Sequence, residues 1–193
     1  MPLPTTPATT ADDPRVGHLL GADLHEGEAP GVVLVGFPSD AGVRRNGGRP
    51  GAAEGPAAIR QALAKLTPDA ASPERFTRLL ARTRDLGDVA VTGDVEADQA
   101  ALAAALAPHL AAGAFSIVLG GGHETAFGHF QAHAAQGRPV RILNWDAHAD
   151  VRELRDGRAH SGSPFRQALE HPSGLCERYV AAGLQPHSLA AAH

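Results

Sequence analysis

The sequence has little cysteine and lacks any long apolar or basic run. Cys176 is its only cysteine among 193 residues, which argues against a disulfide framework and a thiolate metal site, so a reducing cytoplasmic location is the default expectation. No apolar run approaches the about 20 residues of a membrane span. A formal net charge of -4 and the absence of a basic run argue against nucleic acid as a partner.

The amino-terminal segment lacks the features of a targeting signal. Residues 1–10 contain neither a basic region nor a continuous apolar stretch. We therefore expect residues 1–30 to form a flexible arm and residues 31–193 to belong to one domain. A hydrophobic content of 43% and a charged content of 20% are typical of a globular protein.

Short apolar runs alternate with helical patterns along the rest of the chain. Residues 31–37 are apolar and rich in β-branched side chains, which predicts a buried parallel strand. A glycine-rich loop is expected at residues 39–55. Further strands are predicted at residues 85–91, 115–119, 141–145 and 178–182, and helices at residues 94–107 and 125–135, from Pro56 and after Pro164. This alternation predicts an α/β fold, with a mainly parallel sheet and helices on both faces.

For two of the predicted helices, particular residues predict the buried face or the ends of the helix. In the helix that begins at Pro56, Ile59, Leu63 and Leu66 recur at helical spacing. In the next one, Asp94 is positioned as the N-cap, and Pro108 is expected to end or kink the helix.

The segment 146–150, Asp-Ala-His-Ala-Asp, directly follows a predicted strand. In an extended backbone, alternate residues point to one face, so Asp146, His148 and Asp150 would converge beyond the carboxyl end of that strand. Open parallel sheets place ligands at this end. Carboxylates with imidazole suit Mn²⁺, Fe²⁺ or Zn²⁺. Alone, the motif is equally compatible with a capped, solvated strand end.

A second strand end carries His123 after three glycines at residues 120–122. Triple glycine also occurs in phosphate loops, but this segment lacks the Gly-Lys-Ser/Thr of a P-loop and the spacing of a dinucleotide fingerprint. His123 alone would more often be a hydrogen-bonded structural residue. If the two strands are neighbours, however, all four side chains face one crevice, which favours a metal centre.

Residues 120–124, Gly-Gly-Gly-His-Glu, and 144–150, Asn-Trp-Asp-Ala-His-Ala-Asp, resemble the first two signatures of the ureohydrolases. This family comprises arginases, agmatinases and formimidoylglutamases. The resemblance implies an arginase-like α/β fold, two Mn²⁺ ions in each active site, and hydrolysis of a guanidino or amidino C–N bond.

The resemblance also implies roles for individual residues. His123 and Asp150 would bind one manganese ion, His148 the other, and Asp146 would bridge both. Asp146 and His148 are then candidate catalytic residues, which act through a metal-bound hydroxide. His160 is a further candidate for proton transfer, although a loop histidine is more often simply exposed.

Other stretches favour the formimidoylglutamase branch. Residues 36–49, followed by 51–56, resemble its amino-terminal loop, and the residues on either side of His123 match it better than they match arginases. Residues 161–166, Ser-Gly-Ser-Pro-Phe-Arg, resemble its Ser-Gly-Thr-Pro-Phe segment, where arginases and agmatinases have His-Gly. The implied reaction converts N-formimidoyl-L-glutamate into L-glutamate and formamide, in the degradation of histidine.

This substrate carries two carboxylates, and guanidinium groups bind carboxylates bidentately. The candidate substrate-binding residues are Arg152, Asn46, Arg49 and Ser161. Arg44 and Arg45 lie in the same loop, but they are better explained as solvated surface charges.

Part of the family pattern does not occur in the sequence. The resemblance implies a later Asp-x-Asp pair and a glutamate, and neither is found. The chain thus offers four of six expected ligands, so we interpret residues 31–193 as the amino-terminal portion of one ureohydrolase domain. Missing strands predict poor solubility and weak manganese binding. A trimer or hexamer is expected from the family alone.

Two alternative functions stay open. A guanidino hydrolase of the agmatinase or arginase type would release urea instead of formamide. A non-catalytic relic of the metal site would bind metal without turnover, and the missing carboxylates support this alternative.

Overall fold

Within residues 14–188, the part of the chain that the computed structural model describes, the strands form two parallel sheets. The strands are β1 (Val32–Phe37), β2 (Thr83–Asp88), β3 (Phe115–Gly120), β4 (Val140–Trp145) and β5 (Cys176–Ala182). The helices are α1 (Val16–Leu19), α2 (Ala41–Arg45), α3 (Gly55–Leu63), α4 (Pro73–Ala81), α5 (Val95–Ala111), α6 (Thr125–Ala134) and α7 (Pro164–Leu169), with 3₁₀ turns η1 (Ala52–Glu54) and η2 (Pro186–Ser188).

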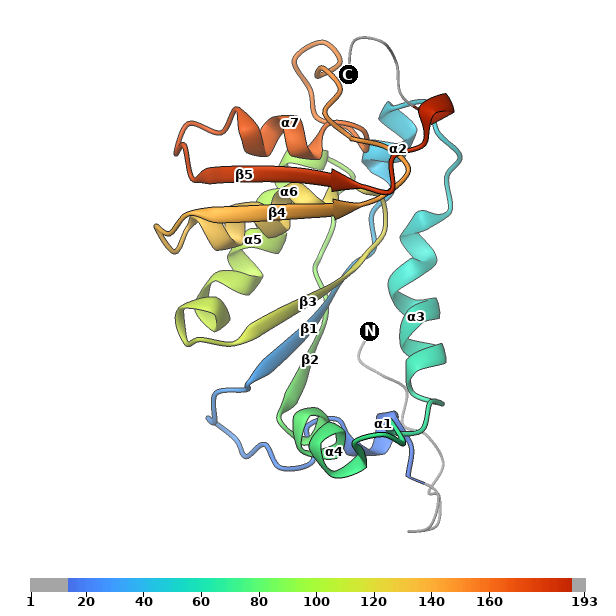
Figure 1. Cartoon of the computed structure of the whole chain (residues 1–193), viewed down its shortest axis with the longest axis vertical. Helices are drawn as coiled ribbons and strands as arrows, with labels where there is room; N and C mark the ends of the chain where they lie inside the picture. Colours follow the sequence, from blue (N-terminus) through green and yellow to red (C-terminus); the bar gives the residue numbers. More distant parts are fainter. Residues whose placement is uncertain (1–13, 189–193) are drawn as a thin grey trace.

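The first sheet has the order β2-β1-β3 and contains the larger core. Every residue of β1 is buried, as its continuous apolar sequence predicts. Helix α5 packs against one face through Leu102, Leu106 and Leu110, while α3 lies along the other face (Figure 1). This sheet therefore has the two-sided cover that is typical of a parallel α/β fold.

The second sheet consists of β4 and β5 and is covered by helices on one face. Phe127 and Phe130 of α6 and Ala168 of α7 pack there, against Ile142 among others. On the opposite face, Leu143 is 64% exposed and Trp145 82% exposed. Val180 pairs with Leu143 across the strands and is exposed as well. In the described part of the chain, this face is open to solvent.

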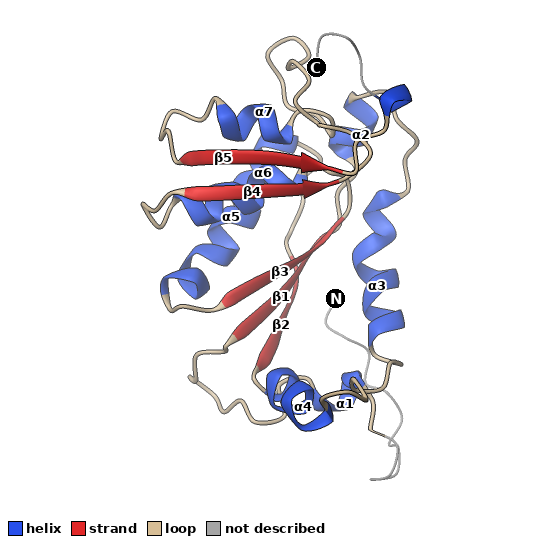
Figure 2. Cartoon of the chain, viewed as in Figure 1, coloured by secondary structure: helices blue, strands red, loops and turns tan. Residues whose placement is uncertain are grey.

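The carboxyl ends of the two sheets converge, although β3 and β4 are not hydrogen-bonded neighbours in the described residues (Figure 2). The expected parallel pairing is confirmed, and within residues 14–188 it is divided between two sheets. The individual predicted strands and helices are confirmed within a few residues. None of the described helices is long and apolar enough to cross a membrane.

The structure corrects the expectation for the amino-terminal arm. Within the expected flexible segment, α1 is packed against the domain: the Val16 side chain is buried, and the Val16 N–H donates to the Leu66 carbonyl at 2.9 Å. The segment 14–30 is therefore part of the fold, while residues 1–13 lie outside the described residues. The glycine-rich loop is also partly helical, since it contains α2 and η1.

Helix α5 begins where the sequence predicts and ends later than predicted. Helix α5 begins after Asp94, whose side chain accepts from the Ala97 N–H at 3.0 Å, so the predicted cap is confirmed. The helix continues past Pro108 because burial of Leu110 against the first sheet extends its apolar contact by another turn.

Helix α3 buries Arg60, which is 1% exposed, while Ile59 lies exposed on its surface. Arg60 donates to Asp85 at 2.9 Å and also to Asp88, so an ion-pair cluster, not the apolar stripe, orients this helix.

Candidate metal centre

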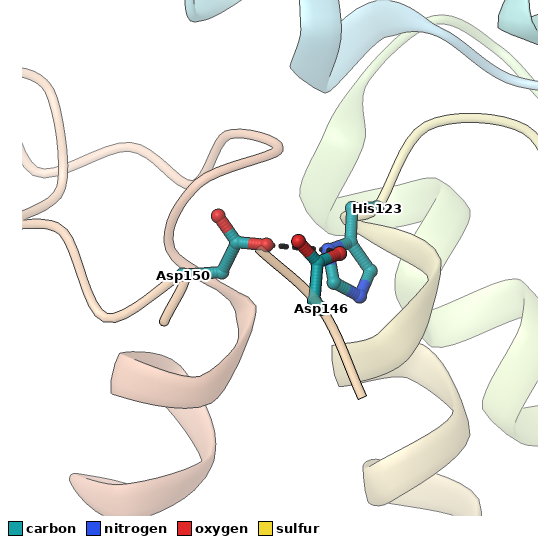
Figure 3. Close-up of side chains that lie close together, drawn as sticks. All are labelled: His123, Asp146 and Asp150. Carbon is teal, nitrogen blue, oxygen red and sulfur yellow. Dashed lines mark hydrogen bonds and ion pairs between the residues drawn. The ribbon is translucent and has the colours of Figure 1, made fainter. Parts of the chain in front are cut away.

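Three side chains predicted from the two strand ends meet in the structure: His123, Asp146 and Asp150 (Figure 3). One donor atom from each lies within 4.8 Å of the other two. The His123 Nδ1 atom is 2.5 Å from Asp150 Oδ2 and 3.9 Å from Asp146 Oδ2. Two carboxylates and an imidazole at this spacing form a donor set that suits a divalent cation of intermediate hardness.

The backbone reaches this arrangement by a bend. Strand β4 ends at Trp145, so the extended geometry expected through residue 150 does not occur. The His148 N–H donates to Asp146 Oδ1 at 2.8 Å, which folds the segment back on itself. Asp150 has a φ of 48°, a left-handed conformation that aspartate tolerates better than most residues.

His148 lies beside the three clustered residues and is half exposed. Its Nδ1 atom is 3.2 Å from Asp146 Oδ1, while the other oxygen of that carboxylate faces His123. Asp146 therefore presents one oxygen to each histidine. This geometry is compatible with a carboxylate that bridges two cations.

The electrostatic environment favours charge in this cluster. Burial lowers the pKa of His123, but its hydrogen bond to Asp150 and the nearby carboxylates outweigh this effect and raise the pKa overall. Burial raises the pKa of Asp146, but hydrogen bonds from His148 and the nearby histidines outweigh this effect, so the pKa is lowered overall. The same negative surroundings that stabilise an imidazolium would stabilise a bound cation.

Glycines allow the loop after β3 to approach its neighbours closely. The Gly122 N–H donates to the Ser39 carbonyl at 2.7 Å. Glu124 is buried and accepts from the Gly42 N–H at 2.7 Å. A Cβ atom at Gly42 would lie 2.5 Å from the Glu124 carboxyl carbon, so a larger residue there would displace the Glu124 side chain from this contact. These contacts tie the turn that carries His123 to helix α2.

The carbonyls of residues 147–150 each accept a hydrogen bond from outside that segment. Main-chain N–H groups of Gln185 and Phe165 donate to Ala147 and Asp150, at 3.1 and 3.2 Å. Two side chains provide the donors in between. Asn144 Nδ2 donates to the His148 carbonyl at 2.9 Å, and the Tyr179 hydroxyl donates to the Ala149 carbonyl at 2.5 Å. The candidate ligand loop is therefore held on both flanks.

Three of the four candidate substrate-binding residues lie together. Asn46 Nδ2 donates to Ser161 Oγ at 3.2 Å, and the Arg152 N–H donates to the Gly162 carbonyl at 2.9 Å. Arg49 is exposed on the loop between α2 and η1. Asn46 and Ser161 thus lie side by side, and the backbone of Arg152 is paired with the residue that follows Ser161.

The neighbouring arginines differ from one another. Arg44 pairs with Asp40 at 2.9 Å and is largely exposed, as a surface charge would be. Arg45 instead joins α2 to the later loop, because it donates to Glu96 at 2.7 Å and to the Ala159 carbonyl at 2.6 Å.

The structure does not favour the catalytic role considered for His160. This side chain is buried, contrary to the expectation of an exposed loop histidine. Its Nδ1 atom accepts from the Gly162 N–H at 3.1 Å, and its Nε2 atom is 2.9 Å from the Glu153 carbonyl. Both ring nitrogens are thus engaged by the backbone, which makes His160 a structural residue of the loop.

Sequence reasoning assigned no role to Asn144, Tyr179 or Glu124. Tyr179 is separated from the ligand loop by 30 residues and has no local motif. Asn144 and Glu124 lie inside the quoted motifs, and their position beside ligand candidates was the signal that could have identified them.

Comparison with known proteins was consistent with this geometry. A sequence profile described as the arginase family matches residues 30–191. A curated formimidoylglutamase from Rhodococcus jostii (strain RHA1) is 46% identical over 180 residues, which are 89% of this chain and 53% of the relative. Another, from Salmonella newport (strain SL254), is 50% identical over 151 residues, 76% of this chain and 43% of the relative. The chain spans about half the length of the curated relatives it matches.

Solved structures of related proteins superpose on this chain. An arginase superfamily protein from Trypanosoma cruzi superposes with a TM-score of 0.82 at 37% identity, over 95% of this chain and 61% of that chain. A Trypanosoma cruzi formiminoglutamase with Mn²⁺ superposes with a TM-score of 0.81 at 37% identity, over 94% and 61% of the two chains. The expected arginase-like fold is therefore confirmed.

Proposed function

Because the chain belongs to the arginase family, we propose that it provides the metal-binding part of a manganese-dependent formimidoylglutamase. The reaction is hydrolysis of N-formimidoyl-L-glutamate to L-glutamate and formamide. The observation that carries the proposal is the convergence of His123, Asp146 and Asp150 from two different sheets. Curated relatives that carry this name, at 46% and 50% identity, support the choice of substrate.

The residues present fit a centre of two Mn²⁺ ions. His123 and Asp150 would hold one cation, His148 the other, and Asp146 both, since its two oxygens face the two histidines. A bound pair of such cations supplies Lewis-acid activation of water near neutral pH. Four protein ligands leave both positions short of donors, and the longer relatives contain sequence that this chain does not cover.

The chain's own residues orient the substrate in this proposal. Arg152 provides a guanidinium for a substrate carboxylate. Asn46 and Ser161 are hydrogen-bonded to each other and provide an amide and a hydroxyl group beside it. Arg49 would reach the second carboxylate from the exposed loop after α2. The half-buried position of Asn46 and Ser161 limits the access of bulk water at this point.

Two broader assignments belong to the same proposal. We propose a role in histidine degradation, in which formimidoylglutamate hydrolysis is a step, and a cytoplasmic location, with which the single cysteine agrees. A homotrimer or homohexamer is proposed by family resemblance.

Manganese titration of the purified chain tests the metal centre. We expect Asp150→Asn to weaken Mn²⁺ binding at least about tenfold, because it removes a charged ligand while asparagine tolerates the left-handed backbone. Glu153→Gln is the matched control, since it neutralises an exposed carboxylate three residues away. Equal affinity of both variants and the wild type would contradict the assignment.

Product analysis tests the substrate. The chain is co-expressed with the part of the Rhodococcus jostii relative that it does not cover, loaded with Mn²⁺, and supplied with N-formimidoyl-L-glutamate, L-arginine or agmatine. We expect formamide from the first compound. Urea from either of the others, without formamide, would assign the site to a guanidino hydrolase, and metal binding without any product would indicate a relic.

A further inference from the structure

We propose that Asn144 and Tyr179 are positioning residues of the metal centre, which hold the ligand loop in the conformation that receives the cation. This inference rests on the proposed function, because it assigns the loop of residues 146–150 to metal binding. The two side chains come from neighbouring strands, β4 and β5, and both reach carbonyls of the loop.

Tyr179 fixes the centre of the loop. Its hydroxyl donates to the Ala149 carbonyl at 2.5 Å, at the residue between the candidate ligands His148 and Asp150. The ring of Phe165 stacks on the tyrosine ring with centroids 4.8 Å apart, and the same phenylalanine contacts the His123 ring edge-on at 5.4 Å. The tyrosine is therefore held in place by an aromatic group that also contacts the ligand from the other sheet.

The tyrosine is suited to act as a donor. Burial raises the pKa of its hydroxyl above the usual value, and the charges of Asp146 and Asp150 act in the same direction. A tyrosine hydroxyl keeps its proton at neutral pH at its ordinary pKa, and this shift favours the protonated form, which can donate to a carbonyl.

Asn144 links the tyrosine to the next carbonyl. Its buried Nδ2 atom donates to the His148 carbonyl at 2.9 Å and to the Tyr179 hydroxyl at 3.2 Å. One amide group carries two N–H donors, so both contacts can form together. A continuous chain of hydrogen bonds thus runs from Asn144 through Tyr179 to Ala149.

These anchors matter because the loop is not in a relaxed backbone conformation. Asp150 has a φ of 48°, a left-handed conformation that a non-glycine residue keeps only where surrounding contacts impose it. A loop already held in this shape loses less freedom when a cation binds. Release of the anchors should therefore weaken metal binding even though neither anchor is itself a ligand.

The test compares two hydroxyl deletions in the full chain. Tyr179→Phe keeps the ring stacked on Phe165 and removes the hydrogen bond to the loop. The matched control, Thr83→Val, removes a buried hydroxyl that donates to the Leu79 carbonyl at 2.8 Å in the first sheet. Free Mn²⁺ is measured by its electron paramagnetic resonance signal during titration, and folding is measured by urea denaturation.

We expect Tyr179→Phe to weaken Mn²⁺ binding about tenfold and Thr83→Val to leave it unchanged, with both variants folded. Asn144→Leu should also weaken binding, and the double variant should lose less than the sum of the two, because the side chains share one hydrogen-bond chain. Mn²⁺ affinity of Tyr179→Phe within twofold of the wild type would overturn the positioning role and leave the proposed function standing. A wild-type chain that takes up no Mn²⁺ would overturn both.

Discussion

The two sheets of this protein share parallel pairing but are stabilised in different ways. The β1-centred sheet has helices on both faces, and a buried ion-pair cluster around Arg60 orients α3 on it. The β4–β5 sheet is covered on one face, while Leu143 and Trp145 are exposed on the other. The first sheet is therefore covered by helices on both faces and leaves apolar residues exposed only on β3, at Phe115 and Ile117, whereas one whole face of the second sheet has no helix over it in the described residues.

The candidate metal centre lies where these two regions meet. His123 follows β3 of the well-covered sheet, whereas Asp146 and Asp150 follow β4 of the partly covered one. A cation bound by all three would join the regions directly. Metal binding and stability of the second sheet should thus be linked, because a ligand that binds only the folded state stabilises it.

The largest expected effect concerns the buried ion-pair cluster of the first sheet. Arg60→Met should lower the free energy of unfolding by about 3–5 kcal/mol, because it removes a fully buried guanidinium from the largely buried Asp85 and the partly exposed Asp88. Urea denaturation measures this change.

The control is Arg141→Met in the second sheet, which removes a comparably short pair with Glu177 (2.7 Å) that is exposed to solvent. It should cost at most about 1 kcal/mol. Similar losses in the two variants would mean that the two regions do not differ in the way described.

A second prediction concerns a contact between the two regions. His129 of α6, the helix that covers the second sheet, lies 2.7 Å from Ser116 of β3 in the first sheet. Burial, together with the neighbouring His133, lowers the pKa of His129 to about 4. The unfolded chain, with a histidine pKa of 6.5, takes up this proton first as the pH falls. The contribution to stability is thus complete above about pH 6.5 and is lost between pH 6.5 and 4, by at most about 3 kcal/mol.

His129→Gln should flatten the pH dependence of the unfolding free energy in this range, as measured by urea denaturation at several pH values. An unaltered slope in His129→Gln would exclude this histidine as the cause.

The smallest expected change in stability comes from the exposed face of the second sheet. Leu143→Gln combined with Val180→Thr should change the free energy of unfolding by less than about 0.5 kcal/mol, because both side chains are exposed. The soluble fraction and the concentration limit for aggregation should rise, since exposed apolar surface promotes association.

Light scattering against concentration measures this effect. Leu79→Gln on α4 removes an exposed leucine elsewhere and should not improve solubility. If it improves solubility as much as the double variant, the exposed face of the second sheet is not a special source of association.

Much of the fold was predictable because it depends on local patterns. The apolar run at residues 31–37 and the helix cap at Asp94 were identified from neighbouring residues alone. The orientation of α3 was not, because Ile59 and Leu66 suggested an apolar face while Arg60 is the residue that is buried. Its ion-pair partners lie at least 25 residues away, and no local pattern indicates them.

The candidate site was likewise predictable only in part. His123, Asp146 and Asp150 were predicted from motifs at strand ends, and the structure brings them together. His148 was predicted with them and contacts only Asp146 among the three. The assignment of all four as metal ligands stays a prediction until metal binding is measured.

The sequence by itself determined which segments form strands and which side chains lie at their carboxyl ends, because short apolar runs and the motifs that follow them are patterns of neighbouring residues. Only the tertiary structure decided that β3 and β4 belong to separate sheets within the described residues and that Tyr179 reaches the ligand loop. These features depend on contacts between segments far apart in the chain. Such contacts form only when packing and hydrogen bonding throughout the folded chain outweigh the conformational entropy that is lost in bringing those segments together.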